Sequence, residues 1–131
     1  RAIMRALHFV RENARVEAAK GALESSDVDA FFKNVLGSGK SSFEYLQNVY
    51  TVKAVDDQGL SLALALTDGF MQTHDGAFRV HGGGFAGTVQ AFVPNDMLEE
   101  FRNGVEKMVG AGSCHVLSIR EAGGIELTKE M

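Results

Sequence analysis

Two glycine-rich stretches of the chain carry residue types that bind phosphate in other proteins. Residues 37–42 are GSGKSS, and residues 81–88 are HGGGFAGT. The first contains the Gly-Lys-Ser that ends a P-loop, in which the lysine and the hydroxyl contact phosphates and magnesium. A P-loop would place its leading glycine at position 34, where this chain has Asn34, and it would follow a strand rather than a predicted helix. A helix break or an exposed turn is therefore the favoured interpretation of residues 37–42.

The second stretch, HGGGFAGT, allows three interpretations. An esterase oxyanion loop can begin with the same histidine and three glycines, but such enzymes also need a G-x-S-x-G nucleophile elbow. This sequence has no such elbow. Consecutive glycine N–H groups can form an anion-binding nest, and glycine lets the backbone approach a ligand closely. Taken alone, the stretch favours a hairpin turn without a ligand over an anion-binding loop, and both interpretations stay open.

The other reactive residue types form no recognisable site. The histidines are His8, His74, His81 and His115, and none has the spacing of a metal-binding pair. No metal site is predicted, and no aspartate is assigned as a catalytic base. The single cysteine, Cys114, cannot form an internal disulfide, which suits a reducing compartment. Its place in an apolar stretch predicts a buried side chain on a strand.

Composition limits the class of protein. The 131 residues are 45% hydrophobic and 23% charged, which is typical of one soluble globular domain spanning residues 1–131. The net charge of -4 argues against general nucleic-acid binding. No apolar run approaches the roughly 20 residues of a membrane span and no signal peptide is recognisable, so a cytoplasmic protein is expected. The chain opens without Met in the middle of a helical pattern, which predicts a piece of a longer protein.

The first half of the chain has the periodicity of helices. Residues 2–20 are predicted to form a helix that ends at Gly21. Its apolar stripe consists of Ile3, Leu7, Val10 and Ala14. A second helix follows and begins with the capping pair Ser26 and Asp29.

Glycines are expected to interrupt that second helix. Gly37 and Gly39 break its pattern, and helix is expected again over residues 41–46. The β-branched residues 48–55 indicate either a strand or an irregular extended link. Residues 58–72 are rich in Ala and Leu and predict a buried helix.

The second half of the chain predicts strands around one more helix. Residues 76–94 alternate in polarity around the glycines, as two strands joined by a turn do. Asn95 or Asp96 is expected to cap a helix that continues through Val109. Strands are predicted at residues 113–119 and, at the end, 123–127. This order favours an α+β fold, with an antiparallel sheet and helices packed on one face, of the ferredoxin-like type.

Two segments together resemble the GHMP sugar and metabolite kinases, in their galactokinase form. The third conserved motif of that superfamily, G-[AG]-G-F-G-G, is matched by Gly82, Gly83, Gly84, Phe85 and Gly87. Ala86 replaces a usual glycine, and Thr88 stands where cysteine often occurs. The opening residues 5–16 resemble the galactokinase pattern Arg-Ala-x-His-…-Glu-x-x-Arg-Val. They match it at Arg5, Ala6, His8, Glu12, Arg15 and Val16. The stretches SSFEYLQNVYT and QGLSLALALT and the closing GGIEL also fit a bacterial galactokinase, so the resemblance covers nearly the whole chain.

The resemblance implies the C-terminal domain of a cytoplasmic galactokinase, which phosphorylates galactose at C1 with ATP and Mg²⁺. The cofactor-binding loop would be Gly82, Gly83, Gly84, Phe85, Ala86 and Gly87, near the ATP phosphates, with Phe85 anchoring it by packing. The catalytic base, the sugar-binding groups and the ATP loop would lie in an N-terminal domain absent from this chain. The chain alone is therefore expected to be inactive.

Two alternatives remain at this point. The chain could be a stand-alone α+β module that binds a small molecule or a partner, or a GHMP kinase acting on mevalonate or homoserine.

Overall fold

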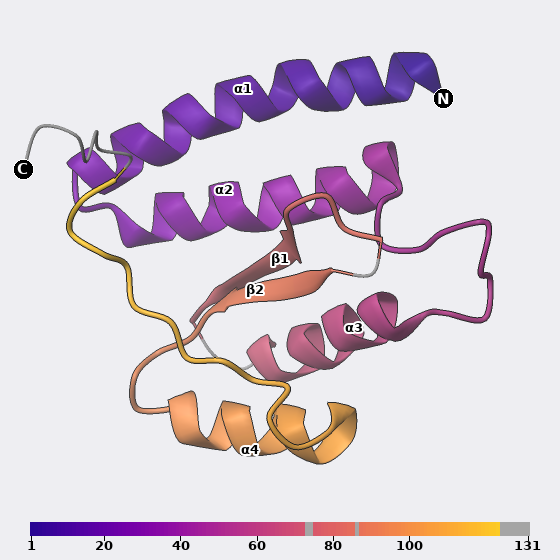
Figure 1. Cartoon of the computed structure of the whole chain (residues 1–131). Coiled ribbons are helices and arrows are strands. Elements are labelled where there is room, and N and C mark those ends of the chain that lie inside the picture. The colour runs from indigo at the N-terminus through magenta and orange to yellow at the C-terminus, as the bar shows by residue number, and fades with distance from the viewer. Residues whose placement is uncertain (73–74, 86, 124–131) are drawn as a thin grey trace, which may run out of the picture.

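The described part of the chain forms helices on both sides of a single β-hairpin in the sequence. The computed structural model describes residues 1–72, 75–85 and 87–123. The elements are α1 (Ala2–Glu24), α2 (Val28–Ser41), the π-helical turn η1 (Ser42–Leu46), α3 (Gly59–Met71), β1 (Ala77–His81), β2 (Thr88–Phe92) and α4 (Leu98–Val109). They stack in the order α1, α2, hairpin, α3 and α4 from top to bottom of Figure 1. The predicted α+β class with antiparallel strands is confirmed.

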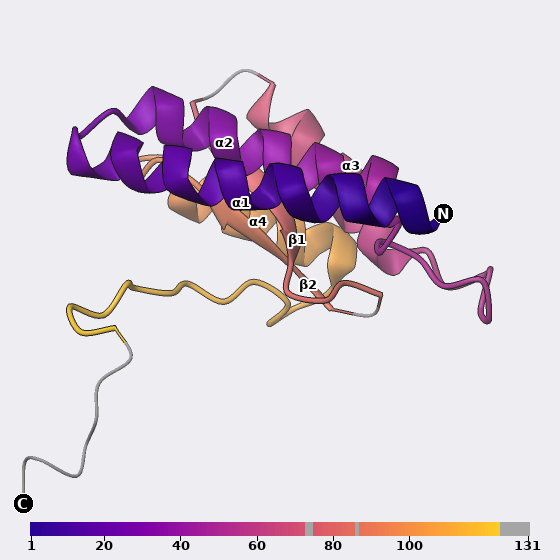
Figure 2. The same cartoon turned by 90° about the horizontal axis from the view of Figure 1, so that it is seen from above.

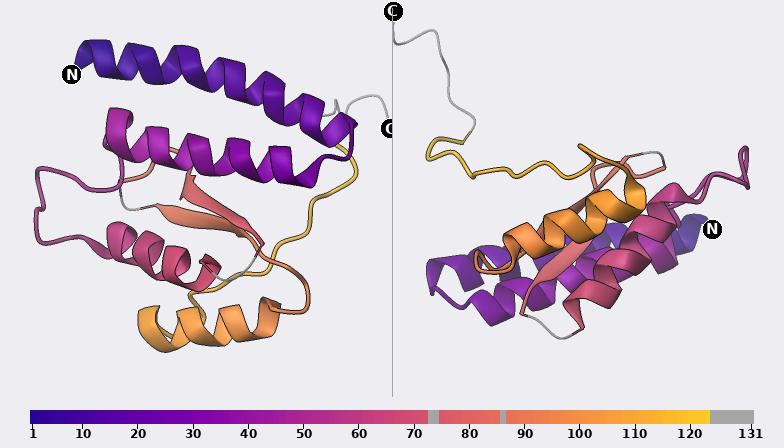
Figure 3. Two further views of the ribbon diagram at one scale, coloured as in Figure 1. Left: turned by 180° about the vertical axis from the view of Figure 1, so that it is seen from behind. Right: turned by 90° about the horizontal axis from the view of Figure 1, so that it is seen from below.

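The hairpin is antiparallel and lies at the centre of the stack. Ala77 pairs with Phe92 at one end, and His81 pairs with Thr88 at the other. Helix α2 lies against β1, and α3 lies against both strands. Figure 3 shows the same order from behind, with α4 outermost below α3.

The apolar core forms where α3 meets the hairpin. Its centre consists of Val49, Leu60 and Val80, with Tyr50, Leu64 and Val89 packed around them. Neighbouring side chains of β1 turn to different helices, because successive residues of a strand point in opposite directions. Val80 joins the core beside α3, whereas Arg79 contacts Ser38 of α2.

The turn between α1 and α2 differs from the predicted one. Helix α1 continues through Gly21 to Glu24, so the predicted stop is wrong. Ser26 has a positive φ of 58° and lies outside α2. The N-cap is Asp27, whose carboxylate accepts a hydrogen bond from the Ala30 N–H at 2.9 Å. An aspartate next to the predicted serine therefore fills the same capping role.

The glycines at 37 and 39 do not interrupt α2, so the predicted break is wrong. The helix runs through both to Ser41 and continues directly as η1. A β-carbon on Gly39 would lie 3.0 Å from the Cβ atom of Arg79 and 3.2 Å from its Cα. The glycine is therefore used for close approach of α2 to β1 and not for a change of direction.

The later boundaries are partly corrected as well. Helix α3 and the hairpin form where they were predicted, and residues 48–55 form the irregular link. Helix α4 begins at Leu98 after an N-cap at Met97 with no side-chain cap, so neither Asn95 nor Asp96 caps it.

Residues 113–119 form no strand, which corrects another prediction. Cys114 is partly exposed, and Ile119 is 91% exposed. Figure 2 shows this segment as an extended chain that lies apart from the stacked elements. A strand needs a partner edge, and nothing in the described residues pairs with this segment. Of the predicted last strand, residues 124–127 lie outside the described residues.

None of the described helices is long and apolar enough to cross a bilayer.

Candidate functional site

The glycine loop between β1 and β2 has an unusual backbone. Its φ angles are +62° at Gly82, +78° at Gly84 and +63° at Phe85, whereas φ at Gly83 is not positive. Left-handed backbone costs a residue with a side chain roughly 1–2 kcal/mol, and glycine avoids this cost. The predicted turn is therefore confirmed, and two of its glycines are needed for its shape.

The loop is tied to the chain segment after η1. The N–H of Phe85 donates to the backbone oxygen of Asn48, and the side-chain Nδ2 of Asn48 donates to the Gly83 oxygen at 3.3 Å. Within the loop, the N–H of Gly87 donates to the Gly84 oxygen at 3.1 Å. A β-carbon on Gly84 would lie 2.1 Å from the Asn48 oxygen. Only glycine fits at position 84.

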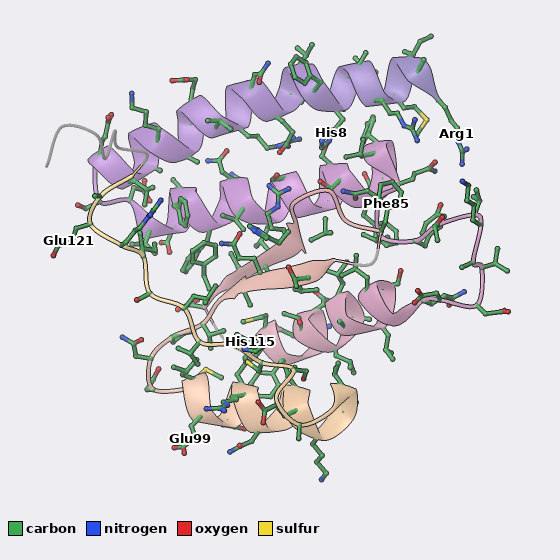
Figure 4. All side chains as sticks on the ribbon, viewed as in Figure 1. Arg1, His8, Phe85, Glu99, His115 and Glu121 are labelled. Carbon is green, nitrogen blue, oxygen red and sulfur yellow. The ribbon has the colours of Figure 1, made fainter. Side chains whose placement is uncertain are left out.

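Phe85 anchors the loop in a different way from the one expected. Its side chain is 50% exposed, so the prediction that its ring packs the loop in place is not supported. The residue is instead held through its main chain, by the bond to Asn48. Figure 4 shows Phe85 beside the turn that follows α2. Ala86 lies outside the described residues.

Three consecutive N–H groups of the loop are open. Within the described part of the chain, the amides of Gly82, Gly83 and Gly84 donate to no acceptor. Gly82 and Gly83 are exposed, and Gly84 is partly exposed. Successive residues whose φ angles alternate in sign turn their N–H groups to one side, which creates a concavity that attracts anions. The arrangement is therefore suited to hydrogen-bonding the oxygens of an anion.

A polar network holds β1, which carries the loop, against α2 and α1. The guanidinium of Arg79 donates to the Ser38 hydroxyl, which in turn donates to the Glu12 carboxylate. Glu12 also pairs with Arg15, and Arg79 lies 3.8 Å from the Glu12 carboxylate. Arg79 Nε donates to the Val80 oxygen at 2.9 Å. The network ends two residues before the loop and fixes the strand from which the loop starts.

The opening segment that carried the family resemblance supplies part of this network. His8 Nδ1 lies 3.0 Å from the hydroxyl of Ser41, and Figure 4 shows His8 pointing from α1 towards α2. Glu12 and Arg15 lie on the same face of the helix, whereas Arg5, Ala6 and Val16 are exposed. Three of the six matching residues therefore have structural contacts in this chain.

The GSGKSS stretch forms no phosphate loop. Its residues belong to α2 and η1, and Ser41 and Ser42 are buried. Lys40 is exposed and lies 3.9 Å from the Glu44 carboxylate, one turn further on. The favoured alternative of a helix break or exposed turn is also wrong.

Two further features lie away from the glycine loop. An open cleft of about 400 Å³ separates α2 from the end of α3. Its polar lining residues are Asp29, Lys33, Asp68, Gln72 and Asp75.

Partial burial raises the pKa of the Cys114 thiol, and the Glu106 carboxylate raises it further, although the Arg102 guanidinium lowers it. A raised pKa makes this thiol less reactive at neutral pH.

Asn48 is the site residue that the sequence did not reveal. It opens the stretch 48–55, whose β-branched residues indicated a strand or a link and gave no sign of contact with a loop far along the chain. Of the loop residues that were predicted, the structure brings Gly82 to Phe85 and Gly87 together in one turn.

Comparison with known proteins agrees with the resemblance noted in the sequence. The chain is 32% identical over 112 residues to a galactokinase from Streptococcus thermophilus. The match covers 82% of this chain and 26% of that enzyme, so the chain spans about a quarter of the length of its relative. No family model and no solved structure matches the chain. The predicted resemblance to galactokinases is therefore confirmed, at 32% identity over 82% of this chain.

Proposed function

We propose that the chain is the C-terminal part of a cytoplasmic galactokinase. The whole enzyme transfers the γ-phosphoryl group of ATP to the C1 hydroxyl of galactose with Mg²⁺. The loop from Gly82 to Gly87 forms one wall of its active-site cleft, near the phosphates of ATP. The observation that carries this proposal is the set of three open, consecutive glycine amides on a loop that matches the third motif of the GHMP kinases. The similarity to the streptococcal galactokinase supports it independently.

The chemistry of phosphoryl transfer suits such a loop. Catalysis of this reaction consists mostly of positioning and of electrostatic stabilisation of the phosphate oxygens. Backbone N–H groups supply both without a side chain, because they are fixed by the fold and point at the anion. Glycine keeps the donors uncovered, so the phosphates can approach the backbone closely.

The proposal assigns no catalytic residue to this chain. The base that activates the sugar hydroxyl, the sugar-binding groups and the glycine- and serine-rich ATP loop belong to the N-terminal portion of the enzyme. When ATP and Mg²⁺ are bound, the metal ion neutralises charge on the β- and γ-phosphates. This chain contributes the open amides at Gly82, Gly83 and Gly84, and it holds them in place through β1 and Asn48.

The first test is an acceptor panel with the long protein. The coding sequence upstream of this chain is expected to encode a P-x-x-x-G-L-S-S-S-A-type loop. The purified product of the whole reading frame is then offered ATP and Mg²⁺ with galactose, mevalonate or homoserine. We expect phosphorylation of galactose alone. Preference for another acceptor would change the assigned substrate, and inactivity towards all three would favour a binding module instead.

The second test uses the chain by itself. We expect it to fold, as measured by circular dichroism, and to transfer no phosphoryl group to galactose. Kinase activity from the purified chain would contradict the assignment of the catalytic groups to another part of the enzyme.

A further inference from the structure

Asn48 contacts the glycine loop with both its backbone and its side chain. Its backbone oxygen accepts from the Phe85 N–H, and its Nδ2 donates to the Gly83 oxygen at 3.3 Å. The residue is only 1% exposed. We infer that Asn48 is a positioning residue of the kinase, which holds the loop in the shape that presents its open amides to the nucleotide phosphates. This inference rests on the proposed function and adds to it a residue outside the conserved motif.

The fit between Asn48 and the loop leaves no room for adjustment. A β-carbon at Gly84 would lie 2.9 Å from both Cγ and Nδ2 of the Asn48 side chain, and closer still to its backbone oxygen. The carboxamide therefore lies directly against the loop backbone. In this position it prevents the loop backbone at Gly84 from moving closer to the segment after η1.

The other end of Asn48 is fixed by rigid elements. Gln47 precedes it in a left-handed conformation with φ of 56°, and its N–H closes η1 on the Ser42 oxygen at 2.8 Å. Val49 follows it and is 1% exposed in the core. The position of the loop is therefore fixed relative to η1 and the core, and not only by the two strands that the loop joins.

The side-chain oxygen of Asn48 shows that this fit has a cost. Oδ1 is buried and has no hydrogen-bond partner in the described part of the chain. Buried polar atoms are nearly always paired, because an unpaired one loses its bond to water without replacement. A carboxamide that only filled space could be replaced by an apolar side chain with a gain in stability. Its presence is explained if the Nδ2 bond to the loop serves the function.

The experiment compares two carboxamides that each donate to a backbone oxygen. Asn48→Ala removes the side-chain contact with the loop and leaves the backbone oxygen in place. Asn34→Ala is the matched control, because Asn34 Nδ2 donates to the Ala30 oxygen at 2.9 Å within α2, on another element. Asn48→Asp keeps the shape but replaces the donor with an oxygen that repels the Gly83 oxygen. Asn48→Asp is included in the measurements below, provided that circular dichroism shows that this variant folds.

Steady-state kinetics of the whole enzyme separates positioning from general loss of structure. We expect Asn48→Ala to raise the KM for ATP about tenfold, the size of effect expected from one positioning hydrogen bond. The KM for galactose is expected to change less than about twofold, and Asn34→Ala is expected to leave both constants unchanged. Equal changes in the two KM values, or none, would overturn the inference.

Hydrogen exchange on the chain alone keeps the inference independent of kinase activity. We expect Asn48→Ala to speed exchange of the Phe85 and Gly87 amides about tenfold, because both are held by the loop shape. The amides of α2 are expected to stay as slow as in the unsubstituted chain. Unchanged exchange at Phe85 and Gly87 would refute the positioning role. If the unsubstituted long protein proves inactive, the proposed function fails while this measurement still decides what Asn48 does to the loop.

Discussion

Residues 37–42 and 82–87 are both rich in glycine and both match part of a phosphate-binding motif, yet they form opposite kinds of structure. The first stretch is helical throughout, and the N–H groups of a helix interior are used by the helix itself. The second leaves three consecutive N–H groups without an acceptor among the residues that the structure describes. Glycine content therefore does not identify a phosphate loop. The flanking pattern decides, because strands on both sides force a turn and helix-forming neighbours do not.

The glycines of the two stretches also have different structural roles. In the helix, Gly39 supplies space, since a β-carbon there would lie 3.0 Å from Arg79 Cβ and 3.2 Å from the Phe78 oxygen. In the loop, Gly84 supplies both space and a backbone angle, because it has a φ of +78° and lies against Asn48. Gly82 supplies the angle only, and Gly83 supplies neither. Alanine substitutions therefore separate the two properties and can be ranked.

Gly84→Ala is expected to have the largest effect. The new β-carbon would lie 2.1 Å from the Asn48 oxygen, so the loop must move and lose its bonds to Asn48. We expect the free energy of unfolding to fall by about 3 kcal/mol, from backbone strain plus lost hydrogen bonds, as measured by urea denaturation of the chain. A loss smaller than about 0.5 kcal/mol would show that Asn48 does not constrain the loop.

The same position should affect the proposed reaction. In the whole kinase, Gly84→Val is expected to lower kcat/KM about 100-fold, because a displaced loop no longer meets the phosphates. The helices should keep their circular dichroism, since the substitution lies on a surface turn. Unchanged turnover would remove the loop from the active site.

Gly39→Ala comes second and tests the helical stretch. Overpacking against β1 costs about 1–3 kcal/mol, whereas the higher helix propensity of alanine returns about 1 kcal/mol. We expect a net loss of up to about 2 kcal/mol. Gly37→Ala is the control, because its β-carbon would meet only the flexible end of Arg15 at 3.5 Å. That variant should be stabilised by up to about 1 kcal/mol, and destabilisation of both to the same extent would contradict the role of space at Gly39.

Local patterns predicted most elements but not their ends. The helices and the hairpin follow from periodicity and alternation, which depend on neighbours in the sequence. The sequence predicts stops at Gly21 and at the glycines of α2. A β-carbon on Gly21 would meet nothing within 4 Å, whereas Gly39 is useful inside a helix because it lies close to a distant residue, Arg79. The predicted strand at 113–119 failed for the same reason, since a strand exists only where another edge pairs with it.

Periodicity also left the orientation of α1 undecided. The apolar stripe of this helix faces solvent, with Ile3 77% and Val10 65% exposed, while its polar side contacts α2. His8 and Glu12 make those contacts. An amphipathic pattern shows that two faces differ, but the partner decides which of them is covered.

The candidate site was predicted in one part and missed in another. The glycines at 82–84 could be recognised because a turn between strands and an open backbone are properties of the residues themselves. Asn48 could not be recognised, since its role depends on a contact between segments 35 residues apart. Its neighbours show ordinary β-branched composition, which carries no information about that contact.

Gly82→Ala ranks third and isolates the backbone angle. A β-carbon at this position meets nothing within 4 Å, so the only cost is the φ of +62°. We expect the free energy of unfolding to fall by about 1 kcal/mol. The fall is smaller than for Gly84→Ala, because the clash with Asn48 is absent at position 82. The comparison of the two variants in urea measures that contribution, and equal losses would mean that crowding at Gly84 is relieved without cost.

Gly83→Ala should change stability least and therefore tests function most cleanly. Its φ is not positive and its β-carbon would project into open space, so we expect a change of less than about 0.5 kcal/mol in urea denaturation. In the proposed kinase the same open space lies beside the amides assigned to the ATP phosphates. A methyl group there should raise the KM for ATP about threefold to tenfold by hindering approach, while the KM for galactose stays unchanged. An unchanged KM for ATP together with unchanged stability would mean that the open side of the loop does not face the nucleotide. The open amides at 82–84 would then be a consequence of the tight turn and not part of a phosphate site.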